Sequence, residues 1–256
     1  MSTSALLSRE AGHAHEAGGR LLVTVRRPNS AGIGRYFPLG FLSHTDDLYR
    51  FSYLRSAVQD SDFRPIFGFG QTDRVYESHD LFPIFGERIM SARRPERPAY
   101  LRSLNLDDDS EPWEILGRSG GRRTGDTIEV IPEPVVAADG SFAATFLVHG
   151  IRHRDERNQA QISALRQGDR LILEEDPTNE ANCLAVKVLN GQRVHLGFVP
   201  DPLAEFVCRA LPSDPEMFVV QANGPETPPH LRLLVRLEGS LPAGERAFQG
   251  TDWETF

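Results

Sequence analysis

The sequence predicts an α+β protein that is mostly β. Short hydrophobic runs recur along the chain between clusters of Gly, Pro, Asn and Asp, which is typical of strands joined by turns. Helical spacing of apolar residues is confined to segments of roughly ten residues. The 256 residues are 39% hydrophobic and 25% charged, so the chain can bury a core. At about 150 residues per domain, its length allows two modest domains or one domain with tails.

Composition and charge exclude several classes of protein. The net charge of −8 argues against a protein that coats nucleic acid, because such binding needs a basic face that displaces counterions. Any contact with DNA must therefore be local. Two cysteines, Cys183 and Cys208, are too few for a disulfide framework or a cysteine-only zinc site. No window approaches the about 20 apolar residues of a membrane helix, and a signal-peptide core is missing, so we expect a cytoplasmic protein.

The N-terminal region divides into an arm and a set of strands. Residues 1–20 are small and polar without a sustained period, and we expect a flexible arm there. The pair His13 and His15 has no further Cys or His nearby, so we expect solvated side chains and no metal site. From Leu21 onward the pattern predicts strands. They are LLVTVRR at 21–27, YFPLGFLSH at 36–44 and LYRFSYL at 48–54.

Three short helices are expected after these strands. The first begins near Ser78, tolerates a proline in its first turn, and continues at near-helical apolar spacing to Ile89. RPAYLRSLNL at 97–106 and EPWEILGRS at 111–119 predict the other two helices. A Gly-rich turn then leads into a strand that ends at Pro132.

A domain boundary is expected at residues 132–143, where PEPVVAADGSFA combines prolines, small residues and an Asp-Gly turn. The elements predicted beyond it are a strand at 145–153, a helix at 155–169, a strand at 170–176, two strands within 183–200 joined at Asn190-Gly191, a helix at 201–211 with Asp201 as its N-cap, and strands at 218–222 and 231–238. The predicted organisation is an arm at 1–20, a first domain at 21–138, a second domain at 139–240 and a C-terminal tail at 241–256.

Catalytic motifs are largely missing, and we expect no enzyme. The segment GRSGGRRTGD at 117–126 lacks the spacing and the lysine of a phosphate-cradling loop, so an arginine-rich surface turn is the better interpretation. No H-E-x-x-H metalloprotease helix occurs. His149 and His153 have the i, i+4 spacing of a helical metal pair, but strand and turn geometry points them apart. We therefore expect no metal and no other cofactor.

The second domain resembles the HIRAN domain. The resemblance rests on FLVHGIRH, LRQGDRLILEEDPTNEANCLAVKV and HLGFVPDPLAEFV, which carry the D-P-x-N…A-[IV]-x-V and [IL]-G-[YF]-V-P signatures and span roughly 143–237. It implies an OB-like β-barrel with two helices. HIRAN domains occur in SWI/SNF-type helicases and as bacterial modules, and the eukaryotic barrel holds the 3′-hydroxyl end of single-stranded DNA. The resemblance therefore implies binding of DNA ends.

Six residues are expected to bind DNA on this basis. Arginines bind phosphates and aromatic rings stack on bases, so Arg152 suits a phosphate and Phe198 offers a base-sized surface. The family's D-P-x-N-P-[YF]-D stretch departs here to D-P-T-N-E-A-N, which removes the aromatic ring at Ala181 and the second acid at Asn182. Asp201 stands where bacterial relatives often carry arginine. The expected DNA-binding residues are Arg152, His153, Arg154, Asn179, Asn182 and Phe198.

Structural roles compete with each of these assignments. Asn179 suits a turn, Phe198 suits packing beneath a sheet, and Asp201 suits a helix cap. Between Phe142 and Ser240 there are 10 Lys and Arg against 13 Asp and Glu, so the domain is not generally basic. A true site must concentrate its arginines on one face.

The first domain resembles the N-terminal subdomain of HipA-type kinases in outline. The matching segments are Gly40-Phe41-Leu42, Phe51-Ser52-Tyr53, Leu81-Phe82-Pro83-Ile84-Phe85 and Glu114-Ile115-Leu116-Gly117. In that family the subdomain belongs to a toxin–antitoxin assembly, so the resemblance implies that residues 21–138 contact a protein partner. The catalytic kinase body has no counterpart in this sequence. Arginines at 93, 94, 97, 118, 122 and 123 suggest a basic surface, although charged loop residues are usually solvated.

We therefore expect a non-enzymatic bacterial DNA-binding protein whose barrel binds single-stranded DNA or DNA 3′ ends, in DNA repair or surveillance. The alternative is a toxin–antitoxin-like protein-interaction regulator that has lost DNA binding through the changes at Ala181, Asn182 and Asp201. A cryptic nuclease or phosphatase is a third possibility, and the missing ligand cluster argues against it.

Overall fold

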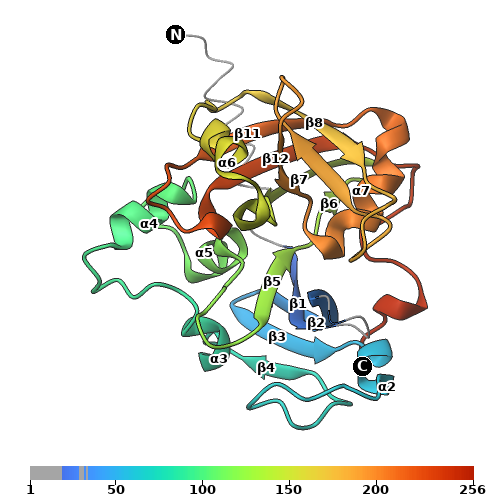
Figure 1. Ribbon diagram of the computed structural model, residues 1–256. Coiled ribbons are helices and arrows are strands. Elements are labelled where there is room, and N and C mark those ends of the chain that lie inside the picture. Colours follow the sequence, from blue (N-terminus) through green and yellow to red (C-terminus); the bar gives the residue numbers. More distant parts are fainter. Residues whose placement is uncertain (1–18, 29–31, 33) are drawn as a thin grey trace.

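The first sheet is built from the N-terminal half of the chain (Figure 1). The computed structural model describes residues 19–28, 32 and 34–256. Residues 1–18 of the arm predicted over 1–20, including His13 and His15, therefore lie outside the described residues. The sheet is antiparallel, in the order β4-β3-β2-β1-β5. Its strands are β1 Arg20–Pro28, β2 Gly34–Thr45, β3 Leu48–Tyr53, β4 Tyr76–Ser78 and β5 Ile128–Pro132.

The second sheet lies above the first in Figure 1 and is also antiparallel, in the order β10-β9-β8-β11-β12-β7-β6. Its strands are β6 Val135–Val136, β7 Ser141–Leu147, β8 Arg170–Glu175, β9 Val186–Leu189, β10 His195–Phe198, β11 Glu216–Ala222 and β12 Leu233–Ser240. Reciprocal backbone hydrogen bonds of 2.9 Å between His149, just beyond β7, and Phe198 of β10 join its two sides. The sheet therefore curls back on itself, while the OB-type assignment stays a prediction.

Short helices cover the sheets. They are α2 Arg55–Gln59, α3 Pro83–Gly86, α4 Arg97–Ser103, α5 Pro112–Ser119, α6 Glu156–Ile162 and α7 Ala204–Ala210. The 3₁₀ turns are η1 Ile151–His153, η2 Asp201–Leu203, η3 Leu211–Ser213, η4 Pro229–Leu231 and η5 Thr251–Trp253. Helix α5 ends where Gly120 adopts a φ of +71°, because glycine enters the left-handed region without a steric cost.

Two predicted helices are shorter than expected. The helix predicted from Ser78 is reduced to α3, because Ser78 pairs with Tyr49 in the first sheet and Pro83 suits the first position of a helix. In α6 the Asp155 side chain caps the first turn by accepting from the Asn158 N–H at 2.7 Å. Residues after Ile162 leave the helix and are tied to the sheet, where the Gly168 N–H donates to the Val219 carbonyl at 2.8 Å.

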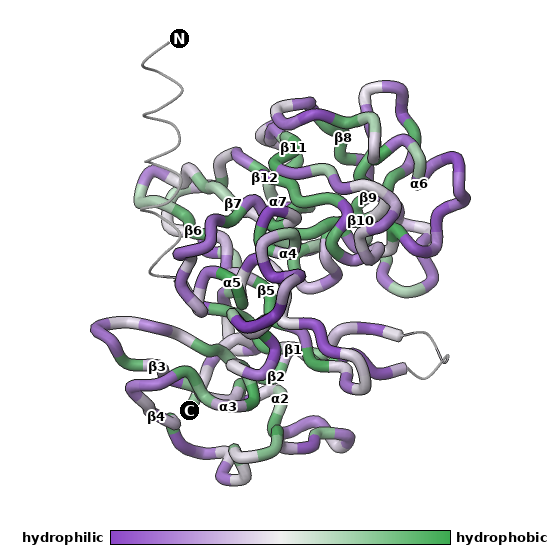
Figure 2. Tube along the Cα trace, turned by 90° about the vertical axis from the view of Figure 1, so that its left-hand side faces the viewer, coloured by the Kyte–Doolittle hydropathy of each residue, from purple (hydrophilic) through white to green (hydrophobic). Residues whose placement is uncertain are grey.

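The two sheets share a hydrophobic core. Leu22, Phe41 and Ile131 of the first sheet belong to the same buried cluster as Phe142 and Val235 of the second. In the hydropathy-coloured trace, hydrophobic segments run through the interior of both parts (Figure 2). Since burial of apolar area is the main favourable contribution to folding, the sheets hold each other in place.

Residues 241–256, which the sequence suggested were a tail, pack against the rest of the protein. The Trp253 ring lies 4.4 Å from that of Phe248 and 6.2 Å from that of Phe41 in the first sheet. The Arg55 N–H donates to the Glu254 carbonyl at 2.9 Å, and Figure 1 shows the C-terminus beside α2. The segment packs here because the aromatic side chains of Phe248 and Trp253 together cover the apolar surface around Phe41 of strand β2.

In the part of the chain that the structure describes, no helix has both the length and the apolar character needed to cross a bilayer.

Candidate functional site

A cavity of about 660 Å³ lies where the first sheet meets the second. One wall comes from the β1–β2 hairpin and the segment before β5, and the other comes from η1, the 179–185 loop, β10 and the 3₁₀ turns η2 and η4. Its acidic and basic side chains are Arg26, Arg35, Arg122, Arg123, Asp126, Glu129, His149, Arg152, His153, Arg154, Asp201 and His230. All six residues expected to bind DNA, together with Ala181, also line this cavity.

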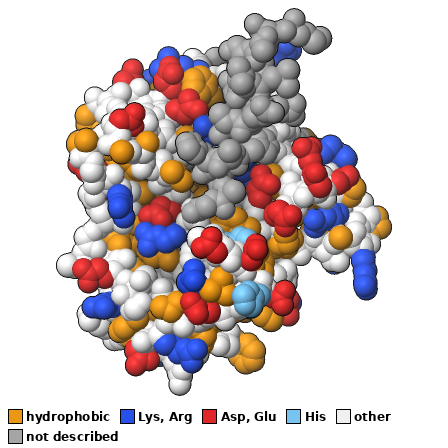
Figure 3. All heavy atoms as spheres, turned by 180° about the vertical axis from the view of Figure 1, so that it is seen from behind, with side chains coloured by type: hydrophobic (Ala, Val, Ile, Leu, Met, Phe, Trp, Pro, Cys, Tyr) orange, Lys and Arg blue, Asp and Glu red, His pale blue; other side chains and the backbone are white. Residues whose placement is uncertain are grey.

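The cavity has more positive than negative side chains. Six arginines face three acids, and each acid has partners: Asp126 pairs with Arg88 at 2.5 Å, and Glu129 pairs with Arg122 at 2.8 Å. Asp201 accepts a hydrogen bond of 2.6 Å from Asn182. On the face shown in Figure 3, acidic and basic side chains are interspersed. The arginines are thus concentrated locally in a protein of net charge −8.

Glu129 is the buried centre of the cavity wall and is 5% exposed. One carboxylate oxygen contacts Arg122, and the other contacts the His149 Nε2 at 3.0 Å. Burial alone would raise the pKa of Glu129, but His149 and Arg122 more than compensate and lower it to about 2. Glu129 belongs to the first sheet and His149 follows β7, so this ion-pair group joins the two parts of the protein.

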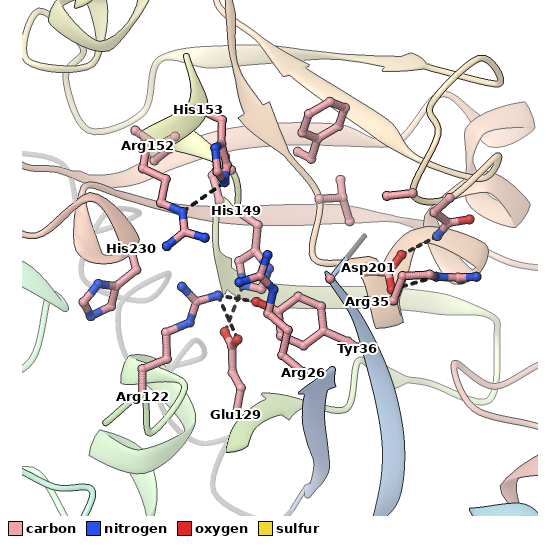
Figure 4. A pocket seen from close by; sticks show the side chains of 18 of the residues that line it. Arg26, Arg35, Tyr36, Arg122, Glu129, His149, Arg152, His153, Asp201 and His230 are labelled. Carbon is pink, nitrogen blue, oxygen red and sulfur yellow. Dashed lines mark hydrogen bonds and ion pairs between the residues drawn. The ribbon is translucent and has the colours of Figure 1, made fainter. Parts of the chain in front are cut away.

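Tyr36 completes the group around Glu129. The Arg122 guanidinium donates to the Tyr36 hydroxyl at 2.5 Å, and the Tyr36 ring lies 5.4 Å from the His149 ring. Burial and the negative charge of Glu129 raise the pKa of Tyr36, so the phenol keeps its proton at neutral pH. The same carboxylate raises the pKa of Arg122 despite the opposing effect of burial. Arg122 is thereby held as a fixed cation facing the cavity, as Figure 4 shows.

The turn η1 carries two of the expected site residues, Arg152 and His153, and Arg154 follows it directly. Gly150 begins it with a φ of +74°, a conformation that L side chains rarely adopt. Arg152 donates to the His153 ring through its Nε at 2.9 Å, which leaves the end of its guanidinium free to point into the cavity (Figure 4). Burial and the neighbouring arginines, Arg152 first among them, lower the pKa of His153.

Arg154 is held over the ring of Phe198. Its guanidinium carbon lies 5.4 Å from the ring centroid, and its Nη1 lies 2.8 Å from the Nδ1 of His195. The His195 ring meets the Phe198 ring edge-on at 4.7 Å. Burial and Arg154 lower the pKa of His195, which favours the neutral imidazole that can accept this hydrogen bond. Phe198 is half-buried, so its ring packs against His195 and also lines the cavity.

Asn179 and Asn182 serve the loop that they belong to. The Asn179 Oδ1 accepts from the backbone N–H groups of Ala181 and Asn182 at 3.0 and 3.3 Å, which is the turn role that competed with DNA binding. The Asn182 Oδ1 accepts from the Leu184 N–H at 2.9 Å. Both side chains line the cavity, but their polar atoms already have protein partners.

The expected capping role of Asp201 is wrong. Pro200 occupies the N-cap position of η2, and the Asp201 carboxylate instead accepts from Asn182 and lies 4.0 Å from the Arg35 Nε. A tertiary hydrogen bond has replaced the local one, because the 179–185 loop brings Asn182 to the start of the turn.

Three cavity residues of the β1–β2 hairpin, Arg26, Arg35 and Tyr36, were not predicted. The signal was present in the sequence as arginines at 26 and 35 on either side of a turn. Another pattern, G-R-S-G-G at 117–121, fits the G-x-S-x-G nucleophile motif. However, Ser119 is buried at the C-terminal end of α5 and is not at a strand-to-helix turn. Among the described residues, no group of three or more metal-ligating side chains is present.

The wall formed by η1, the 179–185 loop and β10 belongs to a recognisable class of domain. Residues 141–241 match the family model of the HIRAN domain, and the chain therefore contains a HIRAN domain in its second part. The match does not extend to the first sheet, so the resemblance of that part to HipA-type kinases stays a prediction.

Two solved structures are similar to about two fifths of the chain. The crystal structure of the HIRAN domain of human HLTF shows 18% identity over 40% of this chain and 77% of that one, with a TM-score of 0.28. A crystal structure of a protein from Lactobacillus plantarum shows 21% identity over 39% of this chain and 99% of that one, with a TM-score of 0.30. No curated protein matches the chain.

Proposed function

We propose that this protein binds single-stranded DNA, at or near a 3′ end, in the cavity between its HIRAN domain and its first sheet. The observation that carries the proposal is the local concentration of six arginines around a cavity that the HIRAN domain helps to form. HIRAN domains are known to bind single-stranded DNA and DNA 3′ ends, and the charge of this cavity suits a phosphate backbone.

Each wall has a role in the proposed complex. Arg152 and Arg154 of the HIRAN domain, and Arg26 and Arg35 of the hairpin, are placed to bind phosphates from opposite sides. The ring of Phe198 offers a surface on which a base can stack, with Arg154 fixed beside it. A single strand exposes both phosphates and base faces, whereas a duplex hides the base faces, so the arrangement favours single strands.

We further propose that the protein acts by binding alone, in the repair or surveillance of DNA ends, with the first domain contacting a protein partner. Metal-dependent degradation of the bound strand would overturn the non-enzymatic part of this proposal, and it is measured directly on denaturing gels.

Fluorescence anisotropy with a labelled single-stranded oligonucleotide, at low and moderate salt, tests the proposal. Arg152→Ala should weaken binding and reduce the slope of log K against log salt by about 0.7, as expected for loss of one phosphate contact to a single strand. The matched control is Arg170→Ala, because the side chain of Arg170 is 57% exposed, pairs with Glu216 and lies outside the cavity lining. This control should bind like the wild type.

Phe198→Ala tests the stacking role and should cost about 1–3 kcal/mol of binding free energy. Unchanged affinity in both Arg152→Ala and Phe198→Ala would contradict the assigned site. If no oligonucleotide binds at low salt, DNA binding is refuted, and the protein-interaction regulator becomes the function to test, by capture of partners on the intact protein.

A further inference from the structure

The inner part of the cavity gathers three arginines and a histidine from four separate elements. Arg26 comes from β1, Arg122 from the segment before β5, Arg152 from η1 and His230 from η4. Figure 4 shows these side chains around one space, with the guanidinium groups of Arg122 and Arg152 directed toward each other. The pKa of His230 is lowered by burial and by Arg122, and Arg26 contributes to lowering the pKa of His153, so these charges are close enough to act on one another.

The positive charge in this space exceeds what the nearby acid can balance. Glu129 is shared between Arg122 and His149. Arg26 and Arg152 have no carboxylate within ion-pair distance among the described residues. Bringing like charges together in a partly enclosed space is unfavourable unless an anion joins them. The cluster is therefore suited to bind an anion, because its arginines are already close together before the anion binds.

A hydroxyl end of DNA does not supply that anion. A 3′-hydroxyl is neutral and is best held by an acceptor, but both oxygens of Glu129 already have partners, Arg122 on one and the His149 ring on the other. The position at which the family carries its second acid is Asn182, whose amide is bonded to Asp201. An internal phosphodiester carries one negative charge, whereas a terminal phosphate monoester carries about −1.5 to −2 at neutral pH and offers three acceptor oxygens.

We propose that the inner cavity binds a strand end that carries a terminal phosphate, with Arg26, Arg122 and Arg152 as its ligands. The Tyr36 hydroxyl and the Glu129 carboxylate fix the orientation of Arg122, so little side-chain freedom is lost when the phosphate binds. This inference rests on the proposed function, which it makes specific for the chemistry of the end.

The experiment compares four oligonucleotides of one sequence by competition anisotropy with the full chain. They carry hydroxyls at both ends, a 3′-phosphate, a 5′-phosphate, or phosphates at both ends. We expect one singly phosphorylated strand to bind at least about tenfold tighter than the hydroxyl strand, since two or three charge-assisted hydrogen bonds are added. The 3′ and 5′ arms identify which end is bound, and the doubly phosphorylated strand should match the tighter arm.

Arg26→Gln provides the matched variant, because the side chain is exposed and its loss leaves the Glu129 group intact. It should erase most of the preference for the phosphorylated end, because the affinity for the phosphorylated strand should fall much further than that for the hydroxyl strand, which loses only an internal phosphate contact at Arg26. Arg170→Gln is the control and should keep the preference. Equal binding of all four strands, or tighter binding of the hydroxyl strand, would overturn the terminal-phosphate site but leave DNA binding in place. Absence of binding to any strand would instead refute the proposed function.

Discussion

Replacing Glu129 with glutamine removes the negative charge that Arg122 and His149 share across the two sheets. The size of the effect follows from the pKa of the carboxyl group, which falls from an ordinary value of 4.5 to about 2 on folding. Because one pKa unit corresponds to about 1.4 kcal/mol, the folded state favours the carboxylate by about 3 kcal/mol. The Arg122 side chain is 31% exposed and can be partly resolvated, so we expect E129Q to lose about 2–3 kcal/mol at pH 7.

The assay is urea denaturation of wild type and E129Q across a pH series. A carboxyl whose pKa is lowered by folding contributes stability above its unfolded pKa and loses it as the pH falls through its folded pKa. The difference between the two proteins should therefore be fully present above about pH 5 and should shrink toward pH 2. At pH 7 the melting temperature should fall by about 5–10 °C, given 2–4 °C per kcal/mol in a chain of this size.

The control is Glu77→Gln, because both side chains of the Glu77–Arg50 pair are exposed to solvent. Its loss should change the free energy of unfolding by less than about 0.5 kcal/mol. An E129Q protein whose free energy of unfolding at pH 7 lies within about 0.5 kcal/mol of wild type would refute the reasoning. In that case the ion-pair group would not hold the sheets together.

Three further predictions concern other parts of the molecule. Gly150→Ala should destabilise the protein by about 1–2 kcal/mol in urea, because the left-handed φ is strained and the new Cβ would lie 3.3 Å from the Phe198 ring; an unchanged midpoint would contradict this. Trp253→Ala should cost about 2 kcal/mol, less than a fully buried ring, and a melting temperature equal to that of wild type would show that the C-terminal segment contributes nothing. Burial raises the pKa of Cys208, so its thiol should react with iodoacetamide more slowly at pH 8 than exposed Cys183, and single serine variants followed by mass spectrometry distinguish the two rates.

Much of the fold could be predicted because it depends on local patterns. Alternating burial in β3 follows its alternating apolar residues, and the three strands predicted over 21–54 are present. Asn190-Gly191 correctly marked the turn between β9 and β10, where the Asn190 side chain accepts from the backbone at Gln192 and Val194. Such short-range features determine the position and type of an element. The ends of the helices depend instead on contacts with other parts of the folded chain, which the sequence does not reveal.

The site could be predicted only on its HIRAN side. Motif residues such as Arg152 and Phe198 were found, and the cavity brings them together, although their binding of DNA stays a prediction. The opposite wall was missed because Glu129 and His149 are apart in sequence and meet only through packing of the two sheets. Sequence periodicity does not indicate a contact of this kind between two sheets. The net charge of −8 also gave no indication of the site, because most of the acidic residues that make the protein negative lie outside the cavity.

The contacts of the C-terminal segment have a consequence for synthesis. Thr255 pairs with Leu54, and the Ser56 hydroxyl donates to the Asp252 carbonyl at 2.6 Å, so the first sheet is completed by residues that follow the HIRAN domain in sequence. A chain emerging from the ribosome can form the HIRAN domain before those residues appear. The contacts between the first sheet and residues 252–255 can therefore form only at the end of synthesis of this segment, after the strands of both sheets have been made.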